Sequence, residues 1–228
     1  VKDDEEIALM RHAQSITDAA FQHMLTFIKP GLTEKEIRTE LENFMFSNGA
    51  DSLAFGSIVA SGPNTANPHA VPSDRVVQRG DFVLMDYGAG YCDYRSDMTR
   101  TVVVGEPTSE QLDLYALVRR THEECAAAVH AGVEGNDIFK LSRKIIGDAG
   151  YGDYYNHGLG HGVGIDIHEM PNFNRSMNII EAGSVITIEP GVYLPGIGGV
   201  RLEDYGVVTE DGYEPFTKST HELQVIDC

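Results

Sequence analysis

Four acidic residues fall where predicted strands end or begin, and they form two pairs. Asp86 and Asp97 are eleven residues apart across a glycine-containing turn, and Glu189 and Glu203 are fourteen apart across a second one. Neighbouring antiparallel strands bring residues with such separations side by side on one face of a sheet. Carboxylates gathered in a protein interior repel one another, and divalent cations are the usual remedy. The two pairs therefore predict a metal centre.

Three of the nine histidines lie within one stretch, HGLGHGVGIDIH, at His157, His161 and His168. The interspersed glycines argue against a helical zinc motif, although His157 and His161 have the spacing of one helical turn. The segment GVGIDIHE alternates like a strand, so the histidines need not point the same way. We assign His161 as a metal ligand and place His168 beside the metals, where it positions a substrate carbonyl or shares a proton. His157 is either a structural histidine bonded to its own loop or a substrate-binding residue.

Four carboxylates and one imidazole can hold two cations when some of the carboxylates bridge them. Oxygen-rich ligation with a single nitrogen is typical of manganese, with cobalt, iron or zinc as alternatives. Two divalent cations lower the pKa of a shared water, which then acts as a nucleophile at neutral pH. The predicted chemistry is therefore a metal-assisted hydrolysis.

The two acid pairs belong to an internal repeat. The stretches RGDFVLMDYG (79–88) and AGSVITIEPG (182–191) both run from a glycine turn through an apolar strand pattern to an acidic residue. A His-x-x-Pro tetrapeptide precedes each stretch, beginning at His69 in one half and at His168 in the other. These matches make chance similarity a poor explanation. A two-fold relation between the halves would bring all four carboxylates to one place.

The leading part of each half predicts two helices. Apolar residues recur at helical spacing over residues 7–28, and Thr33 opens a capping box at the start of a second helix. Thr108 opens a capping box in the second half, and apolar residues line a further helix over 138–145. Each half thus predicts helix, helix, loop, strand and hairpin.

We predict one α+β domain that spans residues 1–228, with halves of about 4–105 and 108–212. A repeat of this length is too long for a solenoid unit. Two copies would instead pack face to face, with antiparallel sheet inside and helices outside.

The composition is that of an ordinary globular protein with an acidic surface. Seventeen basic against thirty-five acidic side chains give a formal net charge of −18, which argues against nucleic acid or an anionic membrane as a partner. No apolar run approaches the roughly 20 residues that span a bilayer. The three scattered cysteines, Cys92, Cys125 and Cys228, favour reduced thiols and a cytoplasmic location.

Five segments of the sequence carry a resemblance that covers essentially the whole chain. They are PHAVPSDR, MDYGAGYCDYRSDMTRT, NHGLGHGVGIDIHE, TIEPGVYLPGIGGVRLEDYGVVTEDG and THELQVI. Together they resemble the metal-dependent Xaa-Pro peptidases, the group that contains aminopeptidase P and prolidase. The resemblance implies the pita-bread fold of the wider methionine-aminopeptidase-like superfamily. It also implies hydrolysis of the bond between an N-terminal residue and a following proline.

The resemblance assigns roles to individual residues. The ligands of two metal ions match Asp86, Asp97, His161, Glu189 and Glu203. His69 and His168 match two histidines that flank the substrate and would stabilise the developing oxyanion. His157 matches a histidine near the proline-binding side, and Arg201 matches an arginine that steadies the ligands. Glu189 would also take the proton of the nucleophile and pass it towards the leaving proline nitrogen.

The family pattern further implies a homodimer and an N-terminal domain that precedes the segment VKDDEEIALMRHA. Methionine aminopeptidase is an alternative that shares the fold and the ligands, but the segments around both acid pairs resemble the Xaa-Pro type. A creatinase-like enzyme without metals, or a non-catalytic binding module, would be expected to have a broken ligand set. All five ligand positions are intact here.

Overall fold

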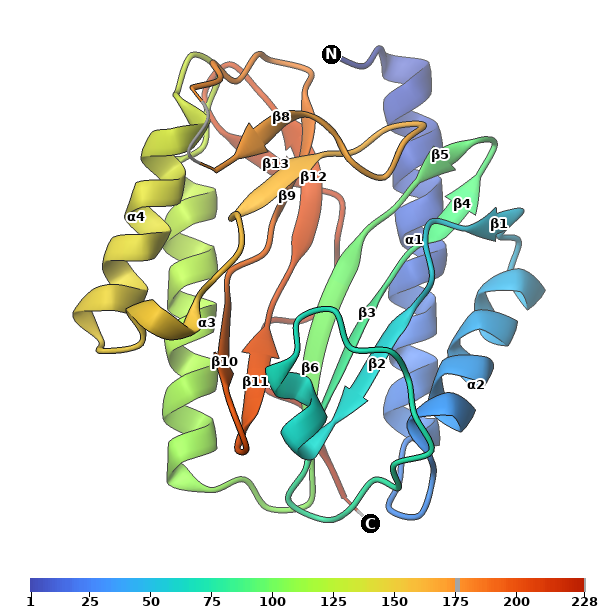
Figure 1. The fold of residues 1–228 in the computed structure, drawn as a ribbon. Coiled ribbons are helices and arrows are strands. Elements are labelled where there is room, and N and C mark those ends of the chain that lie inside the picture. Colours follow the sequence, from blue (N-terminus) through green and yellow to red (C-terminus); the bar gives the residue numbers. More distant parts are fainter. Residues whose placement is uncertain (175–176, 228) are drawn as a thin grey trace.

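Two pairs of helices flank the strands on opposite sides (Figure 1). The computed structural model describes residues 1–174 and 177–227. The helices are α1 (Asp4–Phe27), α2 (Glu34–Ser47), α3 (Ser109–Ala128) and α4 (Gly135–Asp148). Both predicted capping boxes are present, at Thr33 and at Thr108. Each threonine hydroxyl accepts from the backbone N–H three residues on, and the side chain there accepts from the threonine N–H.

The strands of the first half follow α2 and form two sheets. They are β1 (Ser52–Leu53), β2 (Ile58–Ser61), β3 (Phe82–Tyr87), β4 (Ala89–Tyr91), β5 (Tyr94–Arg95) and β6 (Met98–Val104). β2, β3 and β6 lie antiparallel, with the short helix η1 (Gly62–Ala66) after β2. β1, β4 and β5 make a smaller sheet. Apolar side chains of α1 and α2, including Phe21 and Leu41, pack with Val83 and Met85 of β3 into one buried cluster.

The strands of the second half follow α4 and the short helix η2 (Gly152–Tyr154). They are β7 (Gly160–Gly162), β8 (Glu169–Phe173), β9 (Val185–Ile188), β10 (Gly191–Leu194), β11 (Gly198–Arg201), β12 (Asp204–Val208) and β13 (Tyr213–Pro215). Five of them form a sheet in the order β13-β12-β9-β7-β8, and β10 pairs with β11. The architecture is α+β with sheets inside and helices outside, as predicted from the sequence.

The repeat is visible in the turns that lead into matching strands. Gly80 precedes β3 with a φ of 89°, and Gly183 precedes β9 with a φ of 83°. Both values lie in the left-handed region, which glycine adopts without the steric penalty of a Cβ atom. The same turn geometry therefore starts the strand that carries the first acid of each pair.

The two halves meet along a seam at the centre of the molecule. Thr99 on β6 forms a backbone bridge with Glu203, which immediately precedes β12. The Glu203 N–H donates to the Thr99 carbonyl at 3.1 Å, and Arg100 Nη1 donates to the Glu203 carbonyl at 2.7 Å. The contact between the two halves therefore lies next to the acids that were identified from the sequence.

The last strand returns to the first half. β14 (Val225–Ile226) pairs in parallel with β6. This pairing lies outside the antiparallel arrangement expected from the sequence. Among the residues described, 1–174 and 177–227, no helix has the length and apolar character that a membrane crossing requires.

One predicted strand is wrong. Residues 162–169 alternate in hydrophobicity, but the chain bends through 164–168 between β7 and β8. Local contacts take up the backbone groups: Gly164 N–H donates to the Asp166 carbonyl at 3.0 Å, and Asp166 N–H donates to Glu169 Oε1 at 3.1 Å. Val163 is buried but Ile165 is 56% exposed, so the alternation predicted neither burial nor strand pairing in this segment.

Candidate metal centre

Strand pairing explains how each acid pair comes together. Asp86 on β3 faces Thr99 on β6, so Asp97, two residues before Thr99, projects to the same face. Ile188 on β9 faces Asp204 on β12, which places Glu189 and Glu203 next to each other just beyond those strands. The bridge between Thr99 and Glu203 then joins the two pairs.

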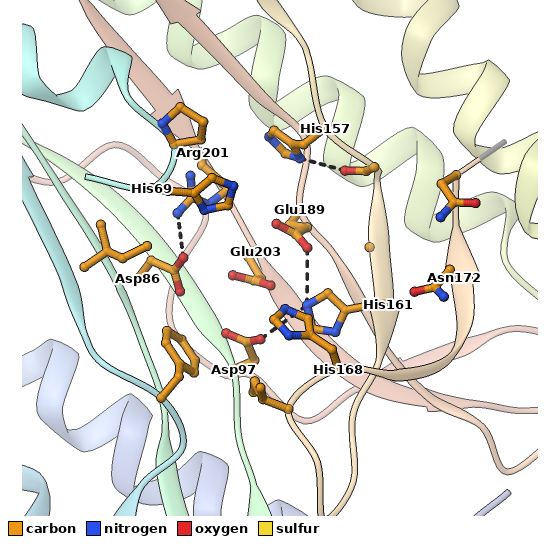
Figure 2. A pocket seen from close by; sticks show the side chains of 17 residues that line it. His69, Asp86, Asp97, His157, His161, His168, Asn172, Glu189, Arg201 and Glu203 are labelled. Atoms are coloured by element: carbon orange, nitrogen blue, oxygen red, sulfur yellow. Dashed lines mark hydrogen bonds and ion pairs between the residues drawn. The ribbon is translucent and has the colours of Figure 1, made fainter. Parts of the chain in front are cut away.

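Asp97, Glu189 and Glu203 lie together on one side of the His161 ring (Figure 2). His161 Nε2 lies 3.6 Å from Asp97 Oδ2 and 3.4 Å from Glu189 Oε1. Ligand atoms of Asp97, His161 and Glu203 all lie within 4.8 Å of one another. His161 Nδ1 donates to the Gly162 carbonyl at 3.0 Å, which directs the Nε2 lone pair towards the carboxylates. Burial lowers the pKa of His161 to about 4, so the ring is neutral and suited to bind a metal.

The carboxylates repel one another in a buried environment. Burial, followed by the charges of Asp86 and Glu189, raises the pKa of Asp97 well above its ordinary value. Burial and the charge of Asp97 do the same for Glu203. Burial also raises the pKa of Glu189 to about 8. The free energy stored in this repulsion is released when a cation enters.

Two oxygens in this cluster have no partner in the structure. Asp86 Oδ1 and Asp97 Oδ1 are buried and accept no hydrogen bond. Buried carboxylate oxygens are rarely left in this condition. Oxygen-rich donors, one neutral imidazole and two unsatisfied oxygens fit divalent metal ions.

Arg201 connects the acids to a polar network. Its Nη2 donates to Asp86 Oδ2 at 2.6 Å, its Nε donates to Thr99 Oγ1 at 3.1 Å, and its Nη1 donates to Tyr193 Oη at 2.8 Å. Thr99 Oγ1 in turn donates to Glu203 Oε2 at 2.6 Å. Arg201 therefore contacts one ligand candidate directly and a second through Thr99, as expected of a residue that steadies the ligands.

His157 uses both of its ring nitrogens. Nδ1 donates to the Gly158 carbonyl at 2.7 Å, and Nε2 accepts from Tyr193 Oη at 2.8 Å. Burial lowers the pKa of His157 to about 4, so the ring is neutral. The loop hydrogen bond matches the structural alternative considered for this residue. Its position in the wall of the central cavity keeps the substrate-binding alternative open.

His69 and His168, the other two histidines identified as site residues from the sequence, line the same central cavity. His168 lies beside His161, with ring centroids 4.3 Å apart. His69 lies in the loop after η1 and lines the cavity from the first half. This cavity has a volume of about 380 Å³. It is lined by every site residue identified from the sequence, namely His69, Asp86, Asp97, His157, His161, His168, Glu189, Arg201 and Glu203.

Several residues of the site were not identified from the sequence. Phe55, Ile58 and Ile167 give the cavity an apolar wall, and Asn172 adds a polar group. Tyr193 joins Arg201 to His157. No spacing rule distinguishes these residues from ordinary core or loop positions. They could be found only once the strands were placed.

Comparison with known proteins identifies the family. Residues 8–210 match metallopeptidase family M24, and the chain belongs to this family. The chain is 42% identical to the Xaa-Pro dipeptidase of Pyrococcus furiosus over 224 residues. This match covers 98% of this chain and 64% of that protein. The family and the side-chain cluster together support binding of divalent metal.

Solved structures show the same fold. The Xaa-Pro dipeptidase from Bacillus anthracis is 45% identical with a TM-score of 0.97, and the X-Pro aminopeptidase from Thermotoga maritima is 39% identical with a TM-score of 0.97. Each similarity covers 99% of this chain and 64% of the other. The pita-bread fold expected from the sequence is thereby confirmed. The chain spans 64% of the length of these relatives.

Proposed function

We propose that this chain carries the catalytic centre of a hydrolase that cleaves between an N-terminal residue and a following proline. The observation that supports it most directly is the cluster of Asp97, His161 and Glu203, with ligand atoms within 4.8 Å of one another, in a cavity that also holds Asp86 and Glu189. These five residues would hold two divalent metal ions. Manganese is the first choice, with cobalt, iron or zinc as alternatives.

When bound, the metal pair supplies Lewis-acid polarisation of the scissile carbonyl and a water of lowered pKa. Glu189 then takes the proton of the attacking water and passes it to the leaving proline nitrogen. Its position supports this role, because Glu189 lines the central cavity and its Oε1 lies 3.4 Å from His161 Nε2.

The histidines hold the substrate on either side of the reacting bond. His69 and His168 would donate hydrogen bonds to the oxyanion that develops on the carbonyl oxygen. His157 would bind at the proline side, held in place by Tyr193. The apolar wall formed by Phe55, Ile58 and Ile167 suits a pyrrolidine ring, which brings apolar surface and no N–H donor at the scissile nitrogen.

The test compares three peptides and two variants. Manganese-loaded protein and a metal-stripped control are given an Xaa-Pro dipeptide, an Xaa-Pro-Xaa peptide and a Met-Ala-Xaa peptide. Asp97→Ala is expected to lose metal and to lower turnover at least about a thousandfold, since a metal contributes several kcal/mol to catalysis. Asp113→Ala, an exposed change on α3, is the matched control and is expected to leave both unchanged.

The pattern of cleavage decides among the alternatives. Cleavage of the dipeptide alone indicates a prolidase, and cleavage of the longer proline peptide indicates an aminopeptidase P. Release of methionine alone would identify a methionine aminopeptidase and contradict the proposal. Metal-loaded protein that cuts none of the three would favour a non-catalytic binding module.

Two further features are part of this proposal. A cytoplasmic location is supported by the free thiols of Cys92 and Cys125, while Cys228 lies outside the described residues. A homodimer is supported by the family resemblance, and sedimentation of the purified chain tests it.

A further inference from the structure

A second cluster of metal-binding side chains lies away from the central cavity. It joins His122 of α3, Asp204 of β12 and His221 of the loop between β13 and β14. One ligand atom from each residue lies within 4.8 Å of the other two. Asp204 Oδ2 is the shared corner, 2.7 Å from His221 Nε2 and 3.8 Å from His122 Nε2.

His122 is the unexplained member of this cluster. Its side chain is 2% exposed, and neither ring nitrogen makes a hydrogen bond. Burial lowers its pKa to about 4, so the ring is neutral and one nitrogen has a free lone pair. An unpaired polar group in the interior is destabilising, because it loses its hydrogen bonds to water without gaining others. The hydrogen bond between His221 and Asp204 provides a partner for each of those two side chains, whereas His122 has no hydrogen-bond partner.

Asp204 is held in one orientation by Arg100. Arg100 Nη2 donates to Asp204 Oδ1 at 2.7 Å and to the Ser219 carbonyl, and Nη1 and Nε donate to the carbonyl oxygens of Thr99, Glu203 and Thr220. Oδ1 is thereby occupied, and Oδ2 is left for the two histidines. A carboxylate oriented through its second oxygen is a common support for a metal ligand.

The spacing of the three groups is close to that of a zinc site. Ligands at 2.0–2.1 Å in a tetrahedron lie about 3.3 Å from one another. The distances of 2.7 and 3.8 Å to Asp204 Oδ2 bracket this value, so side-chain shifts of about 1 Å would complete the geometry. A cavity of about 270 Å³ adjoins the three residues, which leaves room for a water as the fourth ligand.

We propose that His122, Asp204 and His221 bind a zinc ion that is separate from the central metal pair. Two imidazoles and one carboxylate are a ligand set that zinc accepts readily. The ion would tie α3, β12 and the C-terminal loop together, and these segments come from distant parts of the sequence. The cavity beside these three residues shares no lining residue with the central cavity, so the ion would act apart from the central pair.

The experiment counts zinc in a protein whose central site has been disabled. The parent is the full chain with Asp97→Ala and His161→Ala, which removes two central ligand candidates. Bound zinc per chain is measured after equilibrium dialysis and is compared among the parent, His221→Gln, His122→Gln and His130→Gln. His130 is the matched control, since it is an exposed histidine bonded to the Ala131 carbonyl.

The parent is expected to bind one zinc ion more than His221→Gln or His122→Gln, and His130→Gln is expected to match the parent. Zinc at a hundredfold excess over Kd is expected to raise the parent's Tm by about 5–10 °C, and this rise should vanish in His221→Gln. His221 has a side-chain exposure of 26%, so its variant tests the site even if His122→Gln does not fold. Equal zinc content in the parent and His221→Gln would overturn the proposal, as would a parent that binds none.

Discussion

Glu203 and Asp204 are neighbours in sequence, yet their carboxyl groups respond to the protein in opposite ways. Both are buried, at 2% and 3% exposure. They project to opposite sides of the chain, Glu203 towards the central cavity and Asp204 towards Arg100. The pKa of Glu203 is raised well above its ordinary value, whereas the pKa of Asp204 is lowered below its ordinary value.

Burial acts in the same direction on both carboxyls, so the neighbouring charges make the difference. Burial raises the pKa of each. At Glu203, the charges of Asp97 and Glu189 raise it further. At Asp204, burial is opposed by Arg100, His122 and His221, which together outweigh it and lower the pKa. The central cluster therefore lacks positive charge that must come from outside, while Asp204 already has a cation beside it. Two adjacent buried acids therefore lie in opposite electrostatic environments.

The largest expected effect on this comparison comes from neutralising each acid in metal-free protein. Asp204→Asn should lower the free energy of unfolding by about 3–5 kcal/mol, because it leaves the buried Arg100 without its counter-charge. Glu203→Gln should leave stability unchanged or raise it, because it removes a repelling carboxyl. Urea denaturation with a chelator measures both. Equal losses in the two variants would contradict the comparison.

A second test follows the stability of metal-free protein with pH. Glu189 has a folded pKa of about 8 against an ordinary 4.5, so above pH 4.5 the folded state keeps a proton that the unfolded state has released. Stability must then fall as pH rises towards 8. His157 and His161, lowered from 6.5 to about 4, oppose this trend only below pH 6.5.

The decrease in the free energy of unfolding is therefore measured between pH 6.5 and 8, and it should reach about 2 kcal/mol. Urea denaturation across this range measures it. Glu189→Gln should flatten the slope. Added manganese should reverse it, because metal binding requires deprotonated ligands. A metal-free protein that gains stability over this range would show that the central carboxyls do not repel as described.

The smallest expected effect concerns the hydrogen bonds that Tyr193 makes with Arg201 and His157. Tyr193→Phe removes the hydroxyl that accepts from Arg201 and donates to His157, while the buried ring is kept. We expect kcat/KM for an Xaa-Pro substrate to fall about tenfold, the lower end of what supporting residues of a metal site contribute. Tyr154→Phe changes an exposed tyrosine and serves as the control. Equal activity in both variants would show that the network does not affect the site.

Local rules predicted much of this fold. The capping boxes at Thr33 and Thr108 could be predicted from the sequence because a capping box depends only on residues three positions apart. The strand-end acids could be predicted because the repeat presents one such pair in each half. By contrast, the alternation of residues 162–169 predicted a strand that does not form, because Gly164 and Asp166 make local hydrogen bonds instead. The parallel strand β14 has two residues, too few to carry any pattern.

The two candidate metal sites show the same contrast between local sequence patterns and contacts that form only in the folded chain. The residues of the central cavity were identified because they stand in a few dense segments. Tyr193 was missed because its role depends on where Arg201 and His157 come to lie. The cluster of His122, Asp204 and His221 was missed for a similar reason: only the folded chain brings α3, β12 and the C-terminal loop together.

The seam between Thr99 and Glu203 has a consequence for the newly made chain. Asp86 and Asp97 leave the ribosome with the first half, more than a hundred residues before Glu203. Until the second half has been made and has docked, the early carboxylates have no partners and remain hydrated. A growing or truncated chain thus has no complete metal centre. On the proposed assignment, peptide hydrolysis therefore requires that the second half has been made and has docked onto the first.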